Sequence, residues 1–169
     1  MASSLNALAE MARLQNRYRE AEIFYRECLA ICQELGDKRC IAGISHNLGH
    51  VMLRQDDSKN AVNLFKEALK HYQELGNNEG TALCLAGLAG VAALHIPDLA
   101  AQLFGAAEAL LELSQALLSP TDRSAWEHNL GILKGQLDTN RLYAEWNRVR
   151  LLPINQLIYD ALQELVTVR

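Results

Sequence analysis

The sequence has little glycine and proline, few aromatic residues and no excess of basic charge. Of its 169 residues, ten are Gly and three are Pro, and aromatic side chains make up 6%. Few Gly and Pro residues leave room for long uninterrupted helices. The net charge of -4 and the lack of a basic run argue against a nucleic-acid surface, because such surfaces use Lys and Arg to replace counterions. We therefore expect no direct contact with nucleic acid.

The chain also lacks membrane, secretory and metal-binding patterns. No apolar run is long enough to cross a bilayer, and the first thirty residues show no secretory signal, so we expect no membrane contact and a cytoplasmic location. The cysteines form neither a CxxC pair nor a Cys/His zinc spacing, so no metal site is predicted. In a helical chain without a signal peptide they are expected to be reduced and mostly buried: Cys28, Cys32, Cys40 and Cys84.

Motifs for catalysis are absent as well. The sequence contains no GxSxG nucleophile motif and no GxxxxGK[ST] phosphate-binding loop. We therefore predict that the chain is not an enzyme and that it uses no cofactor. What is present is a helix-forming mixture rich in Ala, Leu, Glu and Gln, of which half is hydrophobic. At this length the mixture predicts a single all-α domain that buries its own core.

An internal repeat organises the chain. The segment 33–37 (QELGD) returns almost unchanged at 73–77 (QELGN), forty residues later (73 minus 33), and Ala21, Ala61 and Ala101 follow the same interval. Three coincidences at one spacing indicate a repeat and not a chance helical pattern. Each unit is predicted to be a hairpin of two helices that packs beside the next unit.

Side-chain spacing within the unit resembles the tetratricopeptide repeat. Leu48 and Gly49 lie on the first helix of the second unit, and its second helix places a small, an aromatic and a small residue at Ala61, Phe65 and Ala68. The resemblance implies a right-handed solenoid of helix hairpins. We expect three repeats of about forty residues at 2–36, 37–76 and 77–118, followed by a three-helix capping segment at 119–169.

The first helix of each hairpin is expected to line a concave groove that binds a protein or peptide. The groove is predicted to be polar in repeats one and two, and apolar with small side chains in repeat three. Glu10 would repel a carboxylate, so we do not expect the clamp that grips chaperone tails. The predicted groove residues are Asn6, Glu10 and Arg13 in repeat one; Gly43, His46, Asn47, His50 and Arg54 in repeat two; and Leu83, Ala86, Gly87 and Gly90 in repeat three.

Two alternatives concern parts of this groove. The small residues of repeat three could form the bottom of an apolar pocket for a small ligand. Close packing of another backbone is the simpler explanation for Gly87 and Gly90. His46 and His50 are one helical turn apart and could share a metal ion, but Asn47 replaces the Glu of an HExxH motif and no third ligand is evident. A hydrogen-bonding or pH-sensitive pair of histidines is favoured.

The C-terminal third resembles a second, narrower family. It is similar to the end of bacterial signal-transduction ATPases of the STAND class, including LuxR-type regulators of transcription, over the segment 101–108 (AQLFGAAE) and at Pro120, Asp122, Arg123, Trp126, Glu127, Trp146, Arg150, Leu152 and Pro153. In that class a tetratricopeptide-like superhelix receives the signal for a nucleotide-binding switch domain. The resemblance implies that this chain is such a signal-receiving part.

The first helix offers another interpretation. Its apolar stripe starts almost at residue 1, which fits either a missing upstream repeat or a homodimer contact through Leu5, Leu8 and Ala12. Self-association is therefore the remaining alternative to peptide binding.

Overall fold

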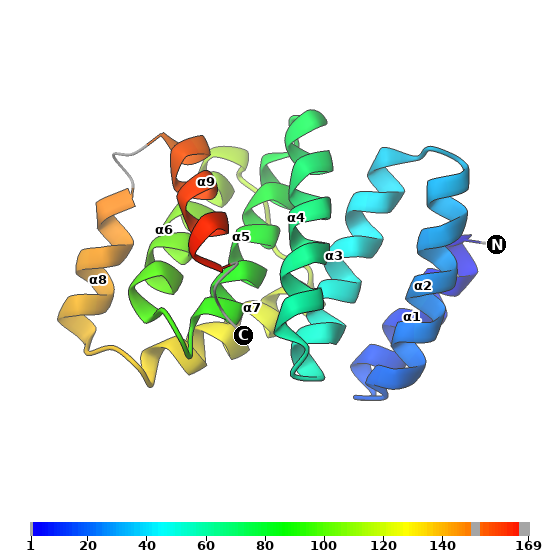
Figure 1. The fold of residues 1–169 in the computed structure, drawn as a ribbon, viewed down its shortest axis with the longest axis horizontal. Coiled ribbons are helices and arrows are strands. Elements are labelled where there is room, and N and C mark those ends of the chain that lie inside the picture. The colour runs from blue at the N-terminus through cyan, green and yellow to red at the C-terminus, as the bar shows by residue number, and fades with distance from the viewer. Residues whose placement is uncertain (1, 150–152, 166–169) are drawn as a thin grey trace.

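The structure is a computed structural model that describes residues 2–149 and 153–165. Within these residues it contains only α-helices and no strand, which confirms the predicted all-α fold (Figure 1). None of the described helices is both long and apolar enough to cross a membrane. The helices are α1 (Ala2–Leu14), α2 (Tyr18–Glu34), α3 (Lys38–Arg54), α4 (Ser58–Glu74), α5 (Asn78–Ala92), α6 (Pro97–Ser114), α7 (Pro120–Lys134), α8 (Thr139–Arg148) and α9 (Ile154–Leu165).

The turns between the first five helices repeat every twenty residues. Left-handed backbone occurs at Asn16 (φ 57°), Gly36 (65°), Asp56 (61°) and Gly76 (63°). Gly, Asn and Asp are the residues that adopt this conformation at least cost. After Gly36 the N–H of the next residue donates to the carbonyl of Cys32 at 3.0 Å, and the same bond after Gly76 reaches Tyr72 at 2.9 Å. The turn closes each helix in the same way, so the forty-residue unit consists of two similar halves.

Side-chain caps start the helices that follow these turns. The side chain of Asp37 accepts hydrogen bonds from the N–H groups of Arg39 and Cys40. The side chains of Asp57 and Asn77 each accept one from the N–H group three residues later in the chain. Each cap satisfies backbone donors that have no partner inside the helix. The turn chemistry visible in the sequence therefore sets where α3, α4 and α5 begin.

Consecutive helices pack as hairpins along one axis, from α1 to α6 (Figure 1). Helix α3 also contacts α5 directly, and α1 and α3 line the same cavities. The first helices of the three hairpins, α1, α3 and α5, therefore form one side of the stack, which we call the inner wall. The fully buried ring of Phe65 lies between two glycines of this wall. A Cβ atom at Gly49 would come within 2.8 Å of the ring and one at Gly87 within 2.5 Å, so both positions need glycine for close packing.

The C-terminal helices close the stack in different ways. Helix α8 packs on α6, where Gly105 lets the backbone of Trp146 approach so closely that a Cβ would meet its carbonyl oxygen at 2.2 Å. Phe104 contacts the rings of both Trp126 and Trp146, with centroids 5.0 and 5.7 Å away, so both tryptophans belong to the packed interior.

Helix α7 departs from the expected role as an end cap. It packs against α5 and so lies across the inner wall of the stack instead of covering its end (Figure 1). The small residues of α5 make this approach possible, because they leave space for another helix. Arg150 and Leu152, two residues of the STAND resemblance, lie outside the described part of the chain.

Candidate functional site

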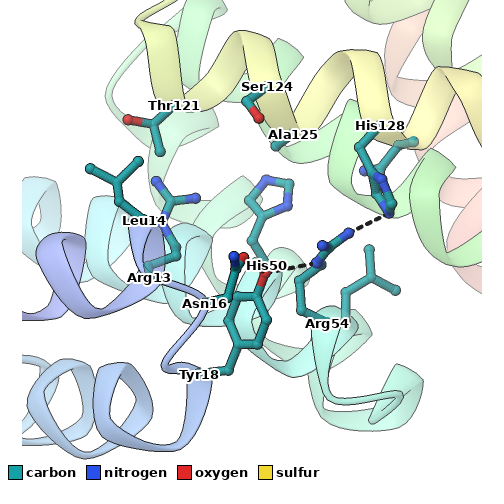
Figure 2. A pocket seen from close by; sticks show the side chains of 12 residues that line it. Arg13, Leu14, Asn16, Tyr18, His50, Arg54, Thr121, Ser124, Ala125 and His128 are labelled. Carbon is teal, nitrogen blue, oxygen red and sulfur yellow. Dashed lines mark hydrogen bonds between the residues drawn. The ribbon is translucent and has the colours of Figure 1, made fainter.

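The inner wall carries a cavity where α1 and α3 face α7. It has a volume of about 200 Å³, and its walls come from α1, the α1–α2 turn, α2, α3 and α7 (Figure 2). We call it the inner pocket. Three of the predicted groove residues line it, namely Arg13, His50 and Arg54. The other lining residues are Leu14, Asn16, Tyr18, Leu53, Thr121, Ser124, Ala125, His128 and Asn129.

Arg13 is the most enclosed cation of the inner pocket. Its side chain is 9% exposed, and one of its terminal nitrogens donates to Glu10 at 2.9 Å. Glu10 also accepts a hydrogen bond from the hydroxyl of Tyr25, a fully buried residue. Burial raises the pKa of Tyr25, so the phenol stays protonated and donates. The Nε atom of Arg13 is buried and has no hydrogen-bond partner, so this guanidinium keeps an unused donor.

The two histidines of α3 form a buried hydrogen-bonded pair, as the sequence favoured. Their Nε2 atoms are 3.2 Å apart, and both rings pack on Phe65, with centroids 6.0 and 5.0 Å from it. His46 Nδ1 lies 3.2 Å from the side-chain oxygen of Asn47, an acceptor, so this nitrogen carries a proton in neutral His46. Burial lowers the pKa of both rings, and the Arg13 charge lowers both further.

Arg54 occupies the open edge of the inner pocket. Its Nε donates to the hydroxyl of Tyr18 at 3.1 Å, and a terminal nitrogen lies 2.5 Å from Nε2 of His128 on α7 (Figure 2). Burial and then the neighbouring Arg54 lower the pKa of His128, so the neutral ring accepts this bond. The pair joins α3 to α7 across the pocket mouth.

The charge of the inner pocket is opposite to that of the whole chain. Two arginines and two histidines line it, and no Asp or Glu is among the lining residues, whereas the chain carries a net charge of -4. The hydroxyls of Thr121 and Ser124 add neutral donors from α7. Such a set of donors suits a carboxylate or another small anion.

Three further groove residues lie together near the N-terminal ends of α1 and α3, whereas the inner pocket lies near their C-terminal ends. Asn6, Gly43 and Asn47 line a cavity of about 400 Å³, which we call the end pocket. Glu10 is hydrogen-bonded to Arg13 and Tyr25, and His46 is buried, with 3% of its surface exposed. The structure therefore divides the predicted polar groove of repeats one and two into two pockets.

The predicted apolar floor in repeat three is not open. Asn129 of α7 is buried over α5, where its side-chain nitrogen lies 3.5 Å from the carbonyl oxygen of Ala86 and a Cβ at Gly90 would meet it at 2.3 Å. Gly87 faces the ring of Phe65 in the hairpin interior and not the groove, while Leu83 is partly exposed. Within the described chain, α7 takes the place that a small ligand would need at Ala86 and Gly90.

The cysteines also differ from the expectation. Cys32 and Cys40 form a disulfide, so the prediction of four reduced thiols is wrong for this pair. The tight turn at Gly36 brings the last turn of α2 against the first turn of α3, and the two Cα atoms are 5.7 Å apart. Cys28 and Cys84 are free and buried.

Sequence reasoning missed the contribution of α7. Thr121, Ser124, His128 and Asn129 line the inner pocket, yet the spacing of the repeat says nothing about a helix outside it. A signal for the cysteine pair was present, because Cys32 and Cys40 lie four residues before and four after Gly36. Helix ends joined by such a turn must be neighbours.

Comparison with known proteins agrees with the repeat architecture. Two models described as tetratricopeptide repeat match the chain, one over residues 40–112 and the other over residues 1–35. No curated protein matches the chain as a relative.

Proposed function

Because this chain is built from tetratricopeptide repeats over residues 1–35 and 40–112, we propose that it is a non-enzymatic cytoplasmic module that binds a protein or peptide on its concave face. Stacked helical repeats generally present such a face to protein partners. The inner pocket is the part of that face with the most distinctive chemistry. We propose that it receives an acidic segment, with one carboxylate placed between Arg13 and Arg54.

The observation that carries this proposal is the lining of the inner pocket, which contains Arg13, Arg54 and two histidines and no Asp or Glu. A guanidinium offers parallel N–H donors that fit a carboxylate. The repulsion expected from Glu10 is reduced, since that carboxylate already accepts from Tyr25 and Arg13. Arg54 and the hydroxyls of Thr121 and Ser124 complete the set of donors.

Selection from a random peptide library tests the proposal. We expect the selected peptides to be rich in Asp and Glu, and the Arg54→Ala variant to bind them about tenfold more weakly, which corresponds to about 1.4 kcal/mol. Arg26→Ala is the matched control, because Arg26 is an exposed arginine of α2 paired with Glu22 and lies outside the inner pocket. Neutral or basic peptides, or equal losses in the two variants, would refute an acidic ligand.

We further propose that the module is the signal-receiving part of a bacterial STAND-class regulator. The support is the resemblance of residues 101–108 and the positions Trp126 and Trp146, whose rings both pack on Phe104 in this fold. The coding sequence around this chain tests the idea. A nucleotide-binding domain with a GxxxxGK[ST] motif is expected in the same gene, and a gene or operon without one would contradict it.

Self-association is a second candidate, favoured by exposed apolar side chains on α1. Leu8 and Met11 are 44% and 53% exposed and lie three residues apart, whereas Ala12 is fully buried and cannot form part of such a contact. A second copy of the chain would cover this apolar row. Light scattering at tens of micromolar is expected to give the mass of a dimer, which Leu8→Glu reduces to a monomer. A strict monomer for the unchanged chain would remove this candidate.

A further inference from the structure

Three cysteine sulfurs meet at the end pocket. Cys28 and Cys32 lie one turn apart on α2, and Cys40 lies in the first turn of α3, where its N–H donates to Asp37 at 3.0 Å. All three sulfur atoms lie within 4.8 Å of one another. Among the described residues, this is the one group of three or more Cys, His, Asp or Glu side chains placed to share a metal ion.

The three cysteines are buried or partly buried, but their sulfurs can be reached through the end pocket. Cys28 and Cys32 are each 1% exposed, yet all three cysteines line the end pocket, so an ion can enter from that cavity. Asn6 lines the same cavity, and its side-chain oxygen is buried and has no hydrogen-bond partner. The cavity that the three cysteines line therefore also contains a residue with an unpartnered buried oxygen. The thiol of Cys28 donates to the carbonyl oxygen of Ala2 at 3.3 Å, and metal binding would replace this hydrogen bond.

We propose that these three cysteines, once the Cys32–Cys40 disulfide is reduced, bind one thiophilic metal ion of the zinc and cadmium class. Thiolates prefer such soft ions. Sulfurs bound tetrahedrally at about 2.3 Å from zinc are about 3.8 Å apart. After reduction the bonded sulfurs of Cys32 and Cys40 must therefore separate, whereas a sulfur pair at the 4.8 Å limit must approach by about 1 Å. The side-chain oxygen of Asn6 or a water molecule takes the fourth position.

The reaction has two balanced steps. A dithiol reductant gives two electrons and two protons to the Cys32–Cys40 disulfide, which becomes two thiols while the reductant becomes a disulfide. The three thiols then release three protons to solvent and coordinate the divalent ion as thiolates, which leaves the site with one negative charge. Arg39, which lines the same pocket, lies near this charge. A disulfide oxidant reverses the sequence: it takes two electrons and two protons from Cys32 and Cys40 and becomes a dithiol. The bonded pair leaves only Cys28 as a ligand, so the ion departs.

Titration of the chain with Cd²⁺ tests the proposal. After treatment with a phosphine reductant, we expect one Cd²⁺ per chain, an ultraviolet thiolate-to-metal charge-transfer band and the release of three protons per ion. The oxidised chain is expected to bind none. Cys28→Ala is expected to weaken binding by more than about 100-fold, since even outer-shell changes at metal sites cost 10- to 100-fold. Cys84→Ala is the matched control, because Cys84 is a buried free cysteine of α5 that lies outside the cluster.

Alkylation of the unchanged chain gives a readout that does not depend on the folding of a variant. Bound Cd²⁺ is expected to protect Cys28, Cys32 and Cys40 together from iodoacetamide. The proposal is overturned if the reduced chain shows no charge-transfer band, if Cd²⁺ protects only two of the three cysteines, or if Cys28→Ala binds as tightly as Cys84→Ala.

Discussion

Two equivalent positions of the repeat, His50 on α3 and Gly90 on α5, meet different environments. They lie forty residues apart, at the same place in successive units. His50 is 8% exposed and lines the inner pocket, whereas Gly90 lies directly beneath Asn129 of α7. A large polar side chain keeps α7 at a distance and leaves a cavity, and a glycine lets the same helix come into contact. The side-chain size at one repeat position therefore separates the open part of the inner wall from the covered part.

The interior that supports both parts is expected to be the most sensitive to change. The fully buried ring of Phe65 lies between Gly49 and Gly87, and both histidine rings pack against it. We therefore expect Phe65→Ala to lower the free energy of unfolding by about 3 to 5 kcal/mol. Chemical denaturation measures this loss. The partly buried Phe24 on α2 is the control, and an equal loss in Phe24→Ala would show that the ring between the glycines has no special role.

The covered part can be opened by adding a methyl group. A Cβ at Gly90 would lie 2.3 Å from the side-chain nitrogen of Asn129 and 2.6 Å from its Cγ, so Gly90→Ala is expected to cost about 1 to 3 kcal/mol and to loosen α7. Gly131→Ala on α7 is the matched control, since a Cβ there meets open space and alanine favours a helix by up to about 1 kcal/mol. Denaturation measures both changes, and amide exchange in α7 reports the loosening. Equal exchange in the two variants would disprove the contact.

The open part of the inner wall is expected to give the smallest effect. There, a lower pH is expected to reduce the stability of the fold through His46 and His50. Because burial lowers the pKa of His46 and His50 in the folded chain, the unfolded chain takes up protons first as the pH falls through about 6.5. The stability that the neutral pair contributes is therefore complete about one pH unit above this value, and it declines as the pH falls towards this value and below it. Asp122 on α7 opposes the shift at His46, while Arg13 on α1 adds to it.

Denaturation at about pH 7.5 and about pH 6.5 measures the decline. We expect the pair to lower the free energy of unfolding by less than about 1 kcal/mol over this interval, and His50→Leu to remove about half of that change. An identical pH dependence in the variant and the unchanged chain would show that His50 does not stay neutral in the fold.

The repeated part of the fold could be predicted closely because its information is local. Gly36 and Gly76 end helices through their left-handed backbone, and Asp37 and Asp57 begin the next ones by capping, so the boundaries of α2 to α5 follow from a few neighbouring residues. The same locality explains why Arg13, His50 and Arg54 could be named as groove residues. It also explains the failure at Gly90, whose environment depends on a residue thirty-nine positions further on.

The amino-acid sequence alone determined the helical class and the forty-residue unit. These properties depend on periodicity and turn chemistry, which act over a few residues. Only the tertiary structure decided that α7 crosses the inner wall, that two arginines and two histidines share one pocket, and that three cysteines meet. Those outcomes depend on how distant helices fit against one another, and packing of that kind is a property of shape in three dimensions and not of spacing along the chain.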